Sequence, residues 1–314
     1  IEESPALTEE VRLEVTNYLL QVLRGKEGVF SGMFQSSLSY EAVRHNHEML
    51  AAMDAYYGWL YFGRYYDLPD ADDWLAKARY CFGAQEQHFK GKDESGNYEA
   101  TAALWPLLSY AIAEPGYTFL PSGVGRTFID RCVITLDNRF SLSGHGDCWD
   151  TDCFAPLTFA IGAWYYRDSG YQYVLEEHYR LRPERSLVFR TYPTFAMHGV
   201  LQPERPARFE GVTVAPLDPG HYAYYREHQD ELLWNTPVTN TFDKLSLRTR
   251  FEPDAQYLLL DGIACGSHGH ADPNCIARFT DNGRVWIVDD CYTEGPFLDA
   301  QNGIQVTRNG LGAP

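Results

Sequence analysis

The hydrophobic period of this sequence changes once, near Pro183, and this change restricts the fold more than any other feature. From Thr8 to about Arg182, apolar residues recur three and four positions apart, the spacing that forms one face of an α-helix. After Pro183, prolines that would each stop a helix recur at short intervals, with short β-rich runs between them. We therefore expect an α+β protein in which a helical domain precedes an antiparallel β domain.

The helical part divides into several segments. Helices are expected near residues 74–87, 101–113, 125–136 and 154–166, and breaks rich in glycine, proline and aspartate separate them. Successive helices joined by short loops are typical of stacked helix pairs. Residues 1–182 are therefore predicted as one all-α domain, and residues 183–314 as the β domain.

The β part contains one clear hairpin, from Asn274 to Asp290. Its centre, Asp281-Asn282-Gly283, lies between two β-rich runs and predicts a tight turn. Strict antiparallel pairing about this turn sets Asp289 opposite Ile276. A further buried strand is expected from Tyr257 to Ile263, and the strand-like run at 307–310 is expected to begin a further part of the same domain.

Charge and composition exclude some classes of partner. A net charge of -17 argues against nucleic acid and membrane surfaces, because both require a positive field, and it disfavours densely sulfated glycans. A carboxylate polymer remains compatible if a few Arg and Lys gather in a cleft. The 22 Tyr and 7 Trp suit a surface on which sugar rings stack, or alternatively a Tyr-rich core. No apolar stretch reaches the roughly 18 residues that a membrane span needs.

The segment from Gly266 to Asn274 carries the most specific local pattern. It contains His268 and His270, and the hairpin that follows ends at Asp289. Imidazole and carboxylate together suit zinc or a similar divalent metal. The alternative is a polar turn in which both histidines form local hydrogen bonds.

Two other places are weaker candidates for substrate contacts. The loop around His145 and Trp149 combines polar and aromatic groups, so it could form a sugar subsite or cap a helix. Arg248 and Arg250 alternate along a predicted strand and so share one side of a sheet, which could face a cleft or water.

Taken together, the motifs resemble those of heparinase II/III-like polysaccharide lyases. The resemblance extends from about Ser39 to Asn309, and Arg44 to Met49 is similar to the Asn-His pair that opens a toroid helix in that family. In the β part it rests on Asp243-Lys244, Tyr257 to Leu260, His268-x-His270-x-Asp272-x-Asn274, Gly283-Arg284 and Val288-Asp289. The resemblance implies an incomplete (α/α) toroid followed by the first part of an antiparallel β-sandwich, both expected to be truncated in this chain.

The resemblance also implies roles for individual residues. Asn46 and His47 match the pair that binds and neutralises the substrate carboxylate, and Arg44 beside them is a further substrate contact. Tyr98, 51 residues after His47, matches a proton-transferring Tyr, although ATAALW follows Glu99 where another Tyr is expected. His268 matches the acid or base of the β domain. The implied activity is β-elimination on an acidic, uronic-acid-containing polysaccharide such as alginate, in a cleft where these residues converge.

A structural metal, expected to be zinc, is implied as well. His270 and Asp289 match two of the family's ligands, whereas Gln301-Asn302 stands where a His-Asn pair is expected. Two other functions remain open, a non-catalytic glycan-binding relative and a toroid glycoside hydrolase that uses Asp147, Asp150 or Asp152. A lyase of this kind is expected in the periplasm or outside the cell, with its export signal absent from this chain.

Overall fold

A computed structural model of the chain describes residues 4–25, 46–86, 99–144, 154–183, 201–217, 238–240, 242–262, 275–289, 302, 307–308 and 311–312. The described α-helices are α1 (Glu9–Leu23), α2 (Asn46–Tyr65), α3 (Ala71–Gln85), α5 (Leu104–Ala113), α6 (Val124–Thr135), α7 (Pro156–Tyr166) and α8 (Ser169–Leu181). A π-helical turn, η2 (Glu99–Ala103), leads into α5. The 3-10 turn η4 (Ala207–Phe209) precedes β1, and η6 (Val238–Asn240) precedes β2. The described strands are β1 (Gly211–Ala215), β2 (Lys244–Arg248), β3 (Tyr257–Asp261), β4 (Ile276–Asp281), β5 (Arg284–Val288), β6 (Thr307–Arg308) and β7 (Leu311–Gly312).

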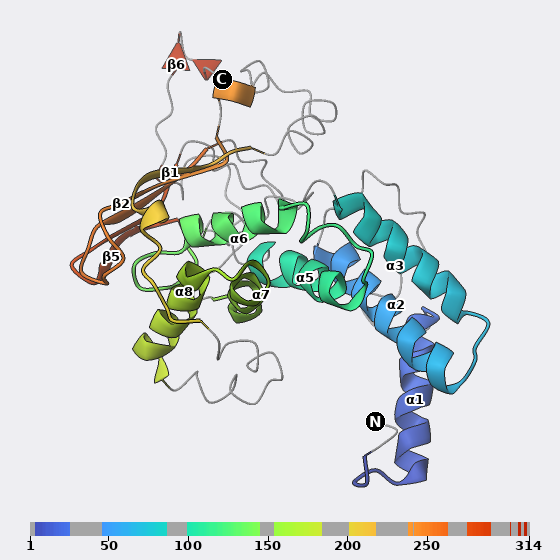
Figure 1. Cartoon of the computed structure of the whole chain (residues 1–314). Helices are drawn as coiled ribbons and strands as arrows, with labels where there is room; N and C mark the ends of the chain where they lie inside the picture. Colours follow the sequence, from blue (N-terminus) through green and yellow to red (C-terminus); the bar gives the residue numbers. More distant parts are fainter. Residues whose placement is uncertain are drawn as a thin grey trace. The chain divides into compact units, whose positions relative to one another are not determined.

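Every described α-helix precedes the first described strand, which confirms the predicted α+β class and its order (Figure 1). The four helices expected from periodicity correspond to α3, α5 with η2, α6 and α7. Contacts divide the chain into two compact units, residues 1–86 and 87–314. Helices α5 to α8 therefore share a unit with the sheet, whereas the hydrophobic period changes about 100 residues later in the sequence, near Pro183.

The first unit is built on the pair α2 and α3. Met49, Tyr56 and Phe62 bury one face of α2, and the buried face of α3 carries Trp74 and Phe82. A left-handed residue, Asp67 (φ 48°), and the turn before α3 reverse the chain between the two helices.

Helix α1 packs closely on this pair within the first unit. A Cβ atom on Gly58 would lie 2.6 Å from Leu23 Cδ1, so a larger residue there would require the Leu23 side chain to move. The Arg24 guanidinium also pairs with Asp70 at 2.6 Å, which fixes the end of α1 against the turn before α3.

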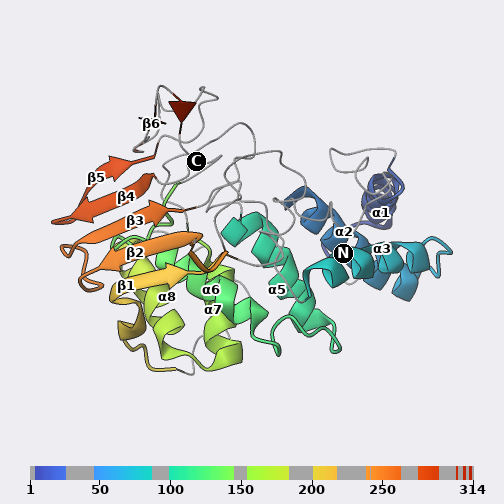
Figure 2. The same ribbon diagram turned by 90° about the horizontal axis from the view of Figure 1, so that it is seen from above.

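In the second unit, strands β1 to β5 form one antiparallel sheet in sequence order, and β6 pairs with β7. Helix α6 contacts β1 and β2, and Figure 2 shows it along one face of the sheet. Helices α6, α7 and α8 meet at Gly162, where a Cβ atom would lie 2.9 Å from Tyr171 and 3.1 Å from Ile129.

The sheet has an unusual distribution of polarity. Along β2, Lys244, Ser246 and Arg248 are buried, whereas Leu245 is half-buried and Leu247 is exposed. The alternating pattern predicts a two-faced strand. Here, however, the polar side chains lie inside and the leucines outside.

The apolar outer face continues across the sheet. Register places Val212 beside Leu247, Leu247 beside Leu258, and Leu258 beside Phe279. Val212 is 63% exposed at the edge strand. The buried face of the sheet therefore combines the polar side chains of β2 with Tyr257 and Leu259 of β3, and the other face is apolar and partly open.

The predicted hairpin is confirmed, with a correction of one residue in its pairing. Asp281 pairs with Arg284 as strict pairing about the turn requires, but the register shifts between Phe279 and Thr280. As a result, the Asp289 N–H donates to the Ala277 carbonyl at 3.1 Å, rather than lying opposite Ile276. A β-bulge moves the partner strand by one position.

Candidate functional site

The predicted carboxylate-binding pair lies at the start of a helix. Asn46 and His47 are the first two described residues of α2, and their side chains lie outside the described residues. The other predicted positions Arg44, Tyr98, His145, Trp149, His268 and His270 also lie outside the described part of the chain.

Asp289 is the one predicted metal ligand that the structure describes. It follows β5 and is buried, with 1% of its surface exposed. The Cys275 thiol lies 3.7 Å from Asp289 Oδ2, close enough for a weak S–H hydrogen bond. The strand register sets these two side chains together at the open end of the β4–β5 hairpin.

Asn302 brings a distant segment to the same place. Its side-chain amide donates to the Val288 carbonyl at 2.6 Å and to the Ile276 carbonyl at 3.3 Å. The Ile276 N–H donates to the Asn302 carbonyl in return. Asn302 therefore lies next to the residue that precedes Asp289, which is where the resemblance expects a further ligand-bearing segment.

The donor set at this end of the hairpin is compatible with zinc but incomplete. A carboxylate and a thiol are both common zinc ligands. Among the residues described in the structure, no group of three His, Cys, Asp or Glu is arranged to hold a metal. The predicted partner His270 lies outside that part.

Arg248 is not placed to contact a substrate, which corrects its assignment. Its side chain is 1% exposed and points from the sheet toward α6. Its guanidinium donates to Asn138 Oδ1 at 2.5 Å and to the carbonyls of Val133 and Leu136. The burial lowers the pKa of Arg248 to about 10, so the group stays protonated at neutral pH.

Arg250 lies beyond the end of β2 and is exposed, so the two arginines do not share one side of a strand.

Arg248 and Tyr257 together satisfy the C-terminal end of α6. The last carbonyls of a helix have no partner within the helix itself. Here Val133 and Leu136 accept from Arg248, Ile134 accepts from the Tyr257 hydroxyl at 2.8 Å, and Thr135 accepts from a loop N–H at 3.0 Å. The cationic guanidinium also interacts favourably with the negative end of the helix dipole.

Asp243 and Lys244, which belong to the matched motif, are part of a buried ionic network. Lys244 is fully buried and lies 2.9 Å from Asp261 and 3.1 Å from Asp243. Asp243 in turn pairs with Arg131 of α6 at 2.5 Å. This network joins the helix to the inner face of the sheet, so these motif residues have a structural role. Alternation along the strand could have revealed two faces, but not which of them is buried.

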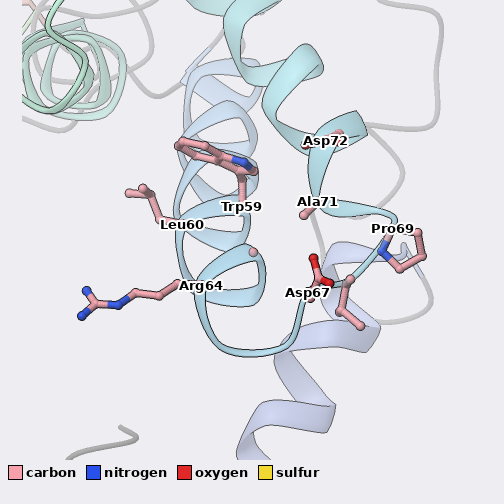
Figure 3. A pocket seen from close by; sticks show the side chains of 9 residues that line it. Trp59, Leu60, Arg64, Asp67, Pro69, Ala71 and Asp72 are labelled. Carbon is pink, nitrogen blue, oxygen red and sulfur yellow. The ribbon is translucent and has the colours of Figure 1, made fainter.

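A pocket of about 620 Å³ lies between the C-terminal end of α2 and the start of α3, in the first unit (Figure 3). Trp59 and Arg64 of α2 line it together with Asp67 of the turn and Asp72 of α3. None of the residues predicted from the sequence lines this pocket. Helical periodicity carries no information about a cavity.

None of the helices in the described ranges is both long enough and apolar enough to cross a bilayer. A scan against models of protein families finds no match, and no curated protein matches the sequence.

Proposed function

We propose that this protein is a polysaccharide lyase that cleaves a uronic-acid-containing glycan by β-elimination. One observation carries the proposal. The hairpin motif of the resemblance ends in a buried carboxylate, Asp289, and the segment at Asn302 returns beside it. The Asn46-His47 pair at the start of α2 supports it, as does the order of helices before an antiparallel sheet.

The chemistry assigns a separate task to each residue of the proposed site. Asn46 and His47 hold the uronate carboxylate and neutralise it, which makes the C5 proton more acidic. A base removes that proton, and the electron pair of the C5–H bond forms the C4–C5 double bond. The C4–O bond breaks, and the departing oxygen takes a proton from an acid. Tyr98 and His268 are assigned to these two proton transfers.

In finer detail, we propose that the helices belong to an (α/α) toroid and that the five-stranded sheet is one layer of a β-sandwich. The outer face of the sheet supports the second part, because Val212, Leu247 and Phe279 form an apolar surface across neighbouring strands. In a sandwich such a face packs against the inner face of a second sheet.

We also propose a structural zinc ion held by His270 and Asp289, in a protein that acts in the periplasm or outside the cell. The buried Asp289 carboxylate and the neighbouring Cys275 thiol support the metal, because they add donors that zinc accepts. Elemental analysis of the protein purified without chelator tests it. The expected result is near-stoichiometric zinc that falls in His270→Ala and in Asp289→Asn, and equal metal content in all three proteins would contradict the site.

The activity is tested on a panel of alginate, glucuronan, hyaluronan, chondroitin, heparan and ulvan. A lyase product carries an unsaturated uronic residue that absorbs in the ultraviolet, so absorbance should grow with at least one of these polymers. Asn46→Ala should weaken both binding and turnover. Polymer binding without any cleavage would instead indicate a non-catalytic glycan-binding relative.

A further inference from the structure

The pocket between α2 and α3 is an open depression whose charged lining residues, Arg64, Asp67 and Asp72, are exposed. Its volume of about 620 Å³ falls within the roughly 300–1,000 Å³ of small-molecule sites. Trp59 supplies a half-buried aromatic wall, and Asp67 and Asp72 supply carboxylates. Figure 3 shows Trp59 and Arg64 extending from α2, with Asp67 and Asp72 on the side of the turn and α3.

Gly63 forms an open part of the wall between the two helices. A Cβ atom at this position would lie 3.8 Å from Trp59 Cδ1, 3.9 Å from Trp59 Nε1 and 3.9 Å from Ala71 Cβ. These are ordinary contact distances, so a side chain fits there without strain. Because Gly63 has none, the indole N–H edge of Trp59 stays uncovered on the side of Ala71.

The polar groups of the pocket are available for a ligand. Arg64, Asp67 and Asp72 form no ion pair with another residue, and the Trp59 indole N–H has no hydrogen-bond partner, within the part of the chain that the structure describes. Neighbouring charges are already used: Asp70 pairs with Arg24, and Asp73 pairs with Lys77. The Arg64 guanidinium lies over the Tyr65 ring, 5.2 Å from its centroid. The pocket therefore offers the indole N–H and two anionic acceptors beside an aromatic ring.

The charge of the lining selects among possible ligands. One arginine and two aspartates give the pocket a negative balance, in a chain with a net charge of -17. A uronate would add a third carboxylate and is disfavoured by repulsion. A neutral sugar ring avoids this repulsion, and its hydroxyls donate strong hydrogen bonds to carboxylates. The weakly positive C–H groups of such a ring also match the negative face of an indole.

We propose that this pocket binds a neutral sugar ring of a glycan, with Trp59 as the stacking surface and with Asp67 and Asp72 as hydroxyl acceptors. Trp59 is 13 residues from Asn46 on the same helix, which corresponds to about 20 Å at about 1.5 Å per residue. The pocket is therefore separate from the proposed catalytic pair. It does not depend on the lyase proposal.

The test follows the indole N–H resonance of Trp59 in a ¹⁵N–¹H spectrum of the whole protein. The chain has 7 Trp, and Trp59→Phe assigns the resonance by its loss. The probes are cellotriose and N-acetylglucosamine as neutral sugars, glucuronic acid as an anion and glucosamine as a cation. The expected result is a saturable shift with a neutral sugar and weaker binding of glucuronic acid.

Matched variants locate the binding. Gly63→Leu should abolish the shift, because its side chain enters the pocket at a position where the helix accepts it. Asp72→Asn should weaken binding by about tenfold through loss of charge-assisted hydrogen bonds. Asp73→Asn is the control, because Asp73 shares the first turn of α3 but faces Lys77 and does not line the pocket.

Three results would overturn the proposal. The first is that neither neutral sugar shifts the Trp59 resonance, and the second is that the shift persists unchanged in Gly63→Leu. The third is that glucosamine binds more tightly than N-acetylglucosamine. The last result would assign the pocket to ammonium groups. Because the readout is binding, a protein that cleaves no polymer can still pass this test, and an active lyase can fail it.

Discussion

The Arg248 side chain on strand β2 donates a hydrogen bond to the carbonyl oxygen of Leu136, the residue that caps the C-terminal end of helix α6. The same guanidinium lies over the rings of Phe251 and Tyr257, at 4.1 and 4.6 Å from their centroids. A buried cation is thus held by carbonyl dipoles and aromatic faces rather than by a direct carboxylate partner. This contact joins the helix to the sheet in the second unit.

Replacing Arg248 by Met should lower the free energy of unfolding by about 2 to 4 kcal/mol, because buried carbonyls of α6 lose their donor. Urea denaturation measures the change. Arg250→Met is the matched control on the same chain segment. Its exposed pairs with Glu252 and Asp254 should contribute less than about 1 kcal/mol. Equal effects of the two variants would contradict a stabilising role for the buried hydrogen bonds of Arg248.

Lys244 and Asp261 should be strongly coupled in a double-mutant cycle. Lys244→Met leaves buried carboxylates without their cation and should cost about 3–5 kcal/mol of stability. Adding Asp261→Asn should restore part of that loss, with a coupling energy of about 1–3 kcal/mol. The exposed pair Arg205 and Glu252, 3.2 Å apart, gives the comparison cycle. Additive effects at Lys244 and Asp261 would contradict a buried pair.

The pH dependence of stability should contain a contribution from Asp137. Burial raises the pKa of Asp137, while Arg278 at 3.4 Å opposes the shift. A carboxyl with a raised folded-state pKa binds more protons in the folded protein than in the unfolded chain. Its contribution to stability is therefore lost as pH rises from the unfolded pKa of about 3.9 through the folded pKa.

Asp137→Asn isolates this effect, because the amide oxygen can still accept the N–H groups of Arg139 and Ser141. The wild-type protein should lose stability relative to this variant as pH rises through that window. Unfolding by urea at a series of pH values measures the difference. A difference that grows in favour of the wild-type protein with rising pH has the opposite sign and would contradict a raised pKa.

Local pattern was sufficient for the helices and the hairpin, because both depend on spacing along the chain. Helix α6 begins one residue before its predicted start and ends one residue before its predicted end. The bulge beside Phe279 was not predictable, since it depends on how β4 fits the neighbouring strands. The burial of Lys244 and Arg248 was not predictable from local pattern, because it depends on α6, more than 100 residues away in the sequence.

Some features of the candidate site also have a local signal in the sequence, and others do not. The hairpin predicted from the sequence ends at a buried carboxylate, Asp289, whereas the role of Asn46 and His47 stays a prediction because their side chains lie outside the described residues. The contact of Cys275 with Asp289 and the return of Asn302 are tertiary features without a local signal. The same holds for the pocket beside Trp59, which arises only when α2 and α3 pack together.

The most direct measurement of the proposed activity compares two products of one reaction. Ultraviolet absorbance counts unsaturated uronic residues, and a reducing-end assay counts broken glycosidic bonds. On the polymer that the protein cleaves, β-elimination predicts one new absorbing residue for each new reducing end. Tyr98→Phe should remove both signals together while leaving polymer binding nearly intact, because it deletes a proton-transfer group and little contact area. Reducing ends that form without absorbance would show hydrolysis and contradict the lyase.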